Sequence, residues 1–269
     1  MILQEHYQFL QQRYPELLAL EIADLRVGAN LLAMKLSDGS IGLASSGPTH
    51  HKHGDKKKRD YGDFTPLQIT GRTLEALFET PRSTNLLQSL RVAALNAVSN
   101  TLNERNNTPI LKDVDLTELF RPGAGKKVAI VGAFHSYIDK ITGMGHEVRV
   151  LEMDETAVLP RHAAFFRPAE EFSSVLPESD IVIMTGLTMV NDTFDDLLSV
   201  CPPEAQTVVM GPSSNLLAEV LFQKKVDIIA GSRVTKPDVL FELVSQGGSG
   251  YHLFQYCAEK VFILNPDTQ

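Results

Sequence analysis

Four short apolar runs in the second half of the chain each end in residues that can contact a small ligand. These residues are Gly132, Phe134 and His135 after the first run, Glu152 after the second, Thr185 after the third, and Gly211, Pro212 and Ser213 after the fourth. If the runs are parallel strands, their carboxyl ends meet at one edge of a sheet, where α/β proteins bind ligands. The spacing therefore predicts one binding site built from these residues.

The turn Gly132-Ala133-Phe134-His135 has the position of a dinucleotide-binding turn but not its composition. Glu152 follows about 20 residues later, the spacing at which an acidic side chain meets a ribose hydroxyl. Phe134, however, replaces the small residue that lets the backbone approach a pyrophosphate. NAD and FAD in their usual pose are therefore disfavoured, whereas a cofactor without pyrophosphate or a planar organic ligand fits. The alternative is an inherited fold in which Glu152 only caps a neighbouring helix.

Two further positions at this edge have both a chemical and a structural interpretation. Gly211-Pro212 is followed by Ser213, Ser214 and Asn215, any of which can cap the next helix, and free N–H groups at a helix start attract carboxylate or phosphate. A plain strand-to-helix turn explains the same residues. His135 opens another expected helix and can act as a general base, as a metal ligand or simply as a surface residue.

The segment His50–Arg59 carries four lysines, one arginine, one aspartate and three histidines, in a chain whose formal net charge is −8. Neutral imidazoles ligate transition metals. The neighbouring lysines disfavour a bare cation and favour an anionic ligand, including a metal chelate. A solvated loop is the alternative interpretation of this segment.

The first part of the chain combines helices with a hairpin. Apolar residues at helical spacing predict a helix near the N-terminus, and Asp38-Gly39 between two apolar runs predicts a β-hairpin. Two more helices are expected at about 71–78 and 84–103. Asn96 lies at the margin of an alanine-rich stripe on the second of them. A buried amide needs partners, so Asn96 either braces a neighbouring loop or points into a cleft between domains.

The second part alternates strands and helices. Short and almost entirely apolar runs predict strands at 128–131, 148–151, 181–185, 207–210, 228–230 and 261–264. Helical stretches between them lie at 193–200, 216–223 and 237–245. The alternation predicts a parallel sheet covered on both faces. A stretch rich in Pro and Gly separates the two parts. We therefore predict an α/β protein with an α+β domain over 1–110 and a Rossmann-like domain over 111–269.

Composition sets the broad class. With 269 residues, 43% of them hydrophobic and 22% charged, the chain has the profile of a soluble globular protein. No apolar run approaches the roughly 20 residues of a membrane helix, and the net charge of −8 argues against general nucleic-acid binding. Cys201 and Cys257 lie far apart without metal-ligand spacing, which favours free thiols in a cytoplasmic protein. A homo-oligomer is compatible with this composition.

Several segments together resemble the heavy-metal-chelation family. They are LRVAALNAVSN at 90–100, VAIVGAFHSYIDK at 128–140 and VVMGPSSNLLAEVLF at 208–222. The resemblance extends over nearly the whole chain and implies an enolase-N-like domain followed by a Rossmann-like domain. It also implies a site between the two domains, with a role in binding heavy metals or their chelators. The residues that the resemblance assigns to this site are Asn96, Phe134, Glu152, Thr185 and Ser213.

Two classes of function follow. The first is a binding protein that recognises a heavy metal or an anionic metal chelate in a cleft between its domains and serves metal homeostasis. The second is an enzyme, transferase-like, that uses an adenosine-type cofactor on the Rossmann-like domain. No nucleophile–base pair or carboxylate pair is recognisable in the sequence, which favours the first class. A bound metal chelate or a bound adenosine compound would discriminate between them.

Overall fold

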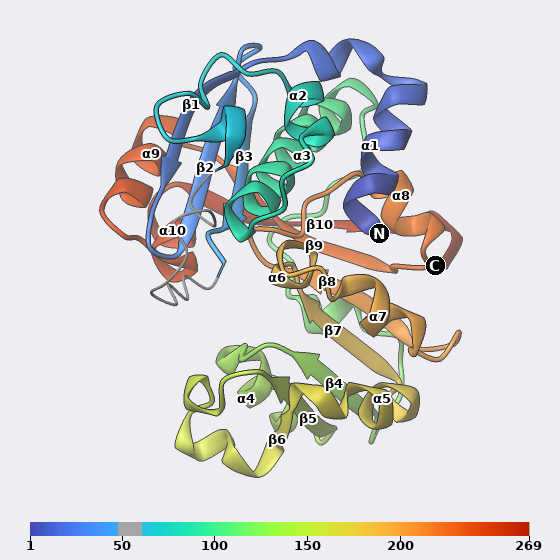
Figure 1. Ribbon diagram of the computed structural model, residues 1–269. Helices are drawn as coiled ribbons and strands as arrows, with labels where there is room; N and C mark the ends of the chain where they lie inside the picture. The colour runs from blue at the N-terminus through green and yellow to red at the C-terminus, as the bar shows by residue number, and fades with distance from the viewer. Residues whose placement is uncertain (48–60, 269) are drawn as a thin grey trace.

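The chain forms two β-sheets with helices around them (Figure 1). The computed structural model describes residues 1–47 and 61–268. The basic segment His50–Arg59, for which the sequence allows a metal-binding or anion-binding role, lies outside the described residues. Within the described ranges, no helix is both long enough and apolar enough to cross a membrane.

The first part contains a three-stranded antiparallel sheet in the order β1-β2-β3. Its helices and strands are α1 (Ile2–Arg13), β1 (Ile22–Val27), β2 (Leu31–Leu36), β3 (Ile41–Ser45), α2 (Leu74–Glu79) and α3 (Asn85–Arg105). The predicted hairpin is confirmed by β2 and β3, which turn at Gly39 with a φ of 89°. Helix α3 lies so close to β3 that a β-carbon at Gly42 would be 1.8 Å from the carbonyl oxygen of Ala93. Glycine at residue 42 therefore permits the close packing of this helix on the sheet.

The second part forms a seven-stranded sheet in the order β10-β9-β8-β7-β4-β5-β6. Its strands are β4 (Lys127–Val131), β5 (Glu147–Glu152), β6 (Phe166–Pro168), β7 (Ile181–Thr185), β8 (Gln206–Met210), β9 (Ile228–Val234) and β10 (Ala258–Leu264). Its helices are α4 (His135–Gly143), α5 (Phe172–Val175), α6 (Leu187–Val190), α7 (Phe194–Ser199), α8 (Ala218–Gln223), α9 (Pro237–Ser245) and α10 (Gly250–Tyr256). Neighbouring strands from β6 to β9 are parallel. The predicted α/β class is therefore confirmed.

The expectation of a purely parallel sheet is wrong at one edge, because β10 runs antiparallel to β9. Strand β9 ends at Val234, and Ala258, the first residue of β10, pairs with it directly. Helices α9 and α10 lie between these two residues in sequence and return the chain to the end of the sheet that it has just left. The chain therefore re-enters the sheet in the opposite direction.

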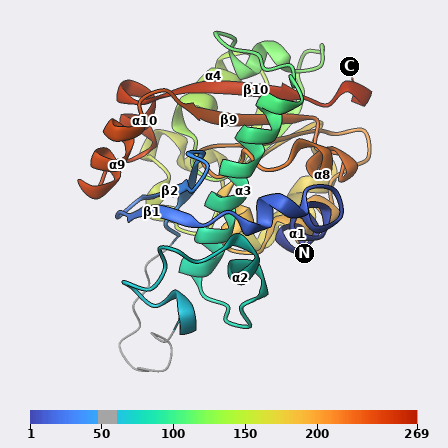
Figure 2. The same cartoon turned by 90° about the horizontal axis from the view of Figure 1, so that it is seen from above.

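Helices of the second part cover the sheet of the first part (Figures 1 and 2). Because strand side chains alternate between faces, β2 is buried on both sides. Leu32 packs in the same hydrophobic cluster as the buried residues of α3. Leu31 and Ala33 pack instead with Leu240 of α9 and Leu253 of α10. The small sheet is thus enclosed between α3 and the pair α9–α10.

One hydrophobic cluster runs through both parts of the chain. It includes Ile2 and Leu90 from the first part, and Val131, Met184 and Ile263 from the strands of the large sheet. A shared core couples the two parts, whichever residue is chosen as the boundary between them. The domain boundary near residue 110 and the enolase-N-like character of the first part stay predictions.

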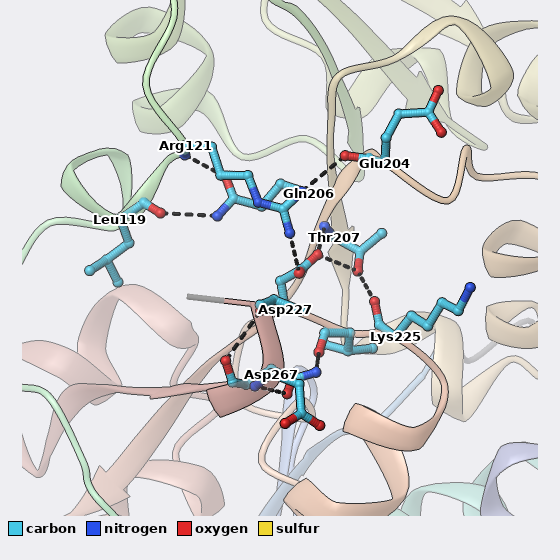
Figure 3. A network of polar contacts seen from close by, with 11 residues as sticks. Leu119, Arg121, Glu204, Gln206, Thr207, Lys225, Asp227 and Asp267 are labelled. Atoms are coloured by element: carbon cyan, nitrogen blue, oxygen red, sulfur yellow. Dashed lines mark hydrogen bonds and ion pairs between the residues drawn. The ribbon is translucent and has the colours of Figure 1, made fainter.

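A polar network fixes the segment before β4 to the large sheet (Figure 3). Asp227 is 5% exposed; one of its carboxylate oxygens lies 2.7 Å from the guanidinium of Arg121, and the other accepts the backbone N–H of Thr207 at 2.7 Å. Gln206 donates to the carbonyl oxygen of Leu119 at 3.0 Å and accepts the backbone N–H of Arg121 at 2.8 Å. These bonds join the segment at 119–121 to β8 and to the start of β9, at the end opposite the predicted site.

Candidate functional site

Six of the nine sequence-predicted residues line cavities at the carboxyl ends of the parallel strands. From β4 the sheet extends through β5 and β6 on one side, and through β7, β8 and β9 on the other. The strand order therefore reverses between β4 and β7, the position at which open α/β sheets bind ligands. Two cavities lie at this edge, and Phe134 lines both of them.

The first cavity, of about 420 Å³, lies at the reversal of strand order, and we call it the acidic cavity. Its lining includes four of the predicted residues, Gly132, Phe134, Glu152 and Thr185. Among the residues that the structure describes, its charged lining residues are Glu152, Glu170 and Asp196, without any lysine, arginine or histidine. Leu151, Phe172 and Leu197 contribute apolar walls. A cavity with this lining disfavours anions and favours neutral or cationic ligands.

The second cavity, of about 630 Å³, lies beyond the ends of β8 and β9, and we call it the aromatic cavity. The predicted residues Phe134, Gly211 and Pro212 line it, together with residues of α10 and β10. Its five aromatic lining residues are Phe134, Tyr137, Tyr251, Phe254 and Phe262. Of the lining residues in the described ranges, Lys260 alone is charged. The two cavities therefore have opposite charge and meet at one phenylalanine.

Lys260 of β10 lies beside two rings of the aromatic cavity. Its Nζ atom is 5.5 Å from the ring centre of Tyr137 and 5.6 Å from that of Phe254, both within cation–π range. The neighbouring carboxylate of Glu259 pairs with other cations, Lys112 and Arg233. Burial, together with the charge of a nearby aspartate, raises the pKa of Tyr137 to about 12, so its phenol stays neutral at physiological pH. The ammonium group thus has aromatic faces but no carboxylate beside it in the cavity wall.

The first turn after β4 is closed to a pyrophosphate. Gly132 has a φ of 106°, which favours glycine, and a β-carbon there would lie 3.4 Å from Cε2 of Phe134 and 3.3 Å from Cβ of Thr185. The phenylalanine ring therefore lies against the glycine that a dinucleotide would approach. This geometry agrees with the sequence-based argument against NAD and FAD in their usual pose.

Glu152 ends β5 and is oriented by its own turn. Its Oε1 atom accepts the backbone N–H groups of Met153 at 2.7 Å and of Asp154 at 3.3 Å. The alternative that Glu152 caps a neighbouring helix is wrong, because the next helical turn, Glu155–Ala157, is capped by the side chain of Asp154. A carboxylate that is fixed through one oxygen can offer the other to a ligand.

His135 is the first residue of α4 and belongs to a chain of three side chains. Its Nδ1 atom lies 3.2 Å from Nδ1 of His162, whose Nε2 atom lies 2.6 Å from the carboxylate of Asp139. Hydrogen bonds from Arg161 and His162 lower the pKa of Asp139 to about 2, so it accepts the His162 proton. When both rings are neutral, His162 then accepts from His135, and Nε2 of His135 is left as the unprotonated nitrogen. Neither histidine lines either cavity.

Asn96 and Ser213 lie in the contact between the two parts rather than in a cavity of useful size. Asn96, 2% exposed, donates through Nδ2 to the carbonyl oxygens of Leu43 and Pro212, the latter at 3.4 Å. Ser213 accepts the backbone N–H of Ser45 at 2.7 Å. The void beside Asn96 has no room for a water molecule. Of the two interpretations of Asn96, the structure therefore favours the brace.

The expected helix cap at Ser213, Ser214 or Asn215 is wrong. Helix α8 begins at Ala218, its N-cap residue is Leu217, and no side chain caps it. The stretch between Met210 and the helix is a loop, in which the Ser214 hydroxyl donates to the carbonyl oxygen of Ala230 at 2.9 Å. Ser214 therefore donates to a carbonyl oxygen of β9 and does not cap the helix. The helix begins only at Ala218, several residues after the end of β8.

The donors of a bare metal ion are lacking in the described part of the chain. There, no group of three or more His, Cys, Asp or Glu side chains is placed to hold a metal ion. Cys201 and Cys257 are free thiols, as the sequence predicted, and burial raises the pKa of Cys201 to about 11. The described residues therefore do not fit a directly coordinated heavy metal.

Sequence reasoning missed the residues that complete the aromatic cavity. Tyr251 and Phe254 belong to α10, which was not expected, and Lys260 lies in a strand taken only as an apolar run. Lys260 and Phe262 are two residues apart and therefore lie on the same face of the strand. A lysine on that face indicates that the face is not wholly buried core.

Two family models match the sequence, and both are described as "Putative heavy-metal chelation". DUF4213 matches residues 14–99, and DUF364 matches residues 115–263. No curated protein matches the chain.

Two solved structures of similar architecture are DUF364 proteins of unknown function. The one from Pyrococcus horikoshii has a TM-score of 0.77 at 22% identity, covering 98% of this chain and 100% of its own. The one from Desulfitobacterium hafniense has a TM-score of 0.71 at 18% identity, covering 97% of this chain and 98% of its own. At these identities the likeness establishes a shared fold. Together with the family match over more than half of its length, it shows that this chain belongs to the DUF364 heavy-metal-chelation family.

Proposed function

We propose that the protein binds an anionic, aromatic metal chelate in the aromatic cavity. The observation that carries this proposal is Lys260, a cation that lies over two rings in a cavity without a lining carboxylate. Such a cation attracts an anionic ligand group, and the low polarity of the surrounding wall strengthens the attraction. The aromatic residues stack on planar groups of the ligand. A volume of about 630 Å³ suits a small organic molecule.

A chelate fits the described residues better than a bare ion does. A bare heavy metal needs several protein donors, and the described residues do not supply three together. In a chelate the donor atoms belong to the chelator, so the protein needs to supply only a complementary charge, a fitting shape and surfaces for stacking. The family description, heavy-metal chelation, supports a metal-containing ligand. The role that follows for the protein is in metal homeostasis.

The ligand of this proposal contacts the second part of the chain. The lining residues of the aromatic cavity all lie between residues 134 and 262. The first part contributes indirectly, because Asn96 donates to the carbonyl oxygen of Pro212, a lining residue. This arrangement modifies the predicted site between the domains: the first part supports one wall and does not close over the ligand.

The test is calorimetric titration with the anionic bis-complex of Cu(II) and pyridine-2,6-dicarboxylate. We expect this chelate to bind, and Lys260→Gln to weaken its binding about tenfold or more, as for the loss of one charge-assisted contact. Free Cu(II) and the metal-free dicarboxylate serve as comparison ligands. Lys236→Gln is the matched control, since it removes an equal charge from an exposed residue outside the cavity.

Two results would overturn the proposal. One is tight binding of Cu(II) alone with no added effect of the dicarboxylate. The other is an equal response of the Lys260→Gln and Lys236→Gln variants to the chelate. Either result would move the site away from Lys260.

A further inference from the structure

We infer that the acidic cavity binds a ribonucleoside that carries no phosphate. This inference concerns a different cavity and a different ligand from the proposed chelate, and neither depends on the other. It rests on four features of the acidic cavity: its position in the sheet, the orientation of Glu152, the ring of Phe134 and the sign of the lining charge.

The position is that of a nucleotide site. The acidic cavity lies where the strand order reverses between β4 and β7, outside the carboxyl ends of the strands. Gly132 in the first turn and Glu152 at the end of the next strand both line it. In sheets of this kind an acidic residue at the end of the second strand accepts hydrogen bonds from ribose hydroxyls.

Glu152 is prepared for this role by its turn. The N–H groups of Met153 and Asp154 hold Oε1, at 2.7 and 3.3 Å. Oε2 takes part in no hydrogen bond with the described residues, so it is available to a ligand hydroxyl. The side chain is therefore oriented before the ligand arrives, which lowers the entropy cost of binding.

A phosphate does not fit the same cavity. The Phe134 ring lies against Gly132, and the backbone N–H groups of Gly132 and Phe134 already donate to the carbonyl oxygens of Leu151 and Gly132. Within the described part of the chain, the charged lining residues are Glu152, Glu170 and Asp196, and their carboxylates repel a phosphate. The described lining therefore disfavours nucleotides and dinucleotides by charge as well as by shape.

The remaining wall suits a flat base. Leu151, Phe172, Leu187 and Leu197 supply apolar surface, and Thr185 supplies a hydroxyl group. Pockets that bind small organic molecules combine an apolar lining with a few polar groups, and 420 Å³ is within their usual range. The ligand class is therefore a neutral or cationic ribonucleoside.

The experiment compares adenosine, 2′,3′-dideoxyadenosine and AMP by calorimetric titration of the full-length protein. We expect adenosine to bind, and both analogues to bind at least about tenfold more weakly. Glu152→Gln keeps an oxygen for the two backbone N–H groups but removes the charge. It should weaken adenosine binding about tenfold and reduce the preference for adenosine over the dideoxy analogue. Glu155→Gln is the control, because Glu155 is exposed in the same turn and outside the cavity lining.

Three results of the titrations with single ligands would overturn the inference. They are the absence of adenosine binding at millimolar concentration, equal binding of adenosine and the dideoxy analogue, and tighter binding of AMP than of adenosine. Saturating Cu(II)–dicarboxylate chelate should leave the adenosine titration nearly unchanged, since the two ligands occupy different cavities. Strict competition between them would assign adenosine to the aromatic cavity and so also contradict the inference.

Discussion

The ring of Phe134 lies against Gly132, with its Cε2 atom 3.4 Å from the point at which a β-carbon on residue 132 would sit. This contact fixes the ring between the acidic and aromatic cavities, both of which it lines. The backbone of one residue and the side chain of another therefore define the boundary between two candidate sites of opposite charge.

Gly132→Ala should destabilise the protein by about 1–3 kcal/mol, the usual cost of a strained backbone position. Alanine is strained at the observed φ of 106°, and its methyl group would meet Thr185 at 3.3 Å. Urea unfolding followed by circular dichroism measures the loss. Gly143→Ala is the control, because it ends α4 with nothing within 4 Å of the added carbon. Equal midpoints for the two variants would contradict this prediction.

Asn96→Asp should cost about 3–5 kcal/mol, the range for an uncompensated buried charge. The amide of Asn96 donates to the carbonyl oxygens of Leu43 and Pro212, whereas an aspartate would turn an oxygen toward both. The free energy of unfolding is the readout. The same change at Asn106, which is exposed at the end of α3, should have an effect below about 0.5 kcal/mol. If Asn96→Asp lowers the free energy of unfolding as little as Asn106→Asp does, the hydrogen bonds of Asn96 are not needed for stability.

Arg121→Met should destabilise the protein by about 1–3 kcal/mol, because Asp227 then keeps a buried carboxylate without its ion-pair partner (Figure 3). A double-mutant cycle with Asp227→Asn isolates the pair from the bonds that Asp227 receives from Thr207. Arg161→Met is the comparison, since its partner Asp139 is half-exposed and this solvated pair should contribute less to stability than the buried one. A coupling free energy near zero would show that the Arg121–Asp227 ion pair does not contribute to stability.

His6 should make the protein less stable as the pH falls below about 6.5. Burial lowers the pKa of His6 to about 4, so the unfolded chain binds its proton more readily than the folded chain does. The stability is complete above the unfolded pKa and falls by about 1.4 kcal/mol per pH unit as the pH drops toward 4, about 3 kcal/mol in total. His6→Gln should flatten this slope in unfolding experiments at pH 4.5–7.5 (roughly the window set by the two pKa values). The exposed His252→Gln should not flatten it.

The strands were predicted well because a strand buried on both faces is an uninterrupted apolar run. The range 181–185 agrees with β7 at both ends, and 237–245 agrees with α9. The direction of β10 and the covering of the small sheet by α9 and α10 could not be predicted in this way. The spacing of apolar residues indicates whether a segment is buried, but not which distant segment covers it.

The candidate site was predicted in part for a similar reason. Strand-end reasoning brought Gly132, Glu152 and Thr185 to one edge, because parallel strands end together. Lys260 was not predicted in this way, because its strand is antiparallel to the others and Lys260 lies near its amino end. Ser213 is near the edge in sequence but is turned toward Ser45. Chain order alone does not distinguish a side chain that faces a cavity from one that seals a contact.

The hydrophobic cluster that runs from Ile2 to Ile263 has a consequence for the synthesis of the protein. The first part emerges from the ribosome well before the strands that cover it, at a pace of about 5–20 residues per second. Its α3 face meets Val131 and Met184 only later, and Ile263 joins the cluster later still. The nascent chain therefore displays unsatisfied apolar surface for seconds. Its need for chaperones should be greatest while residues 127–263 are still being made.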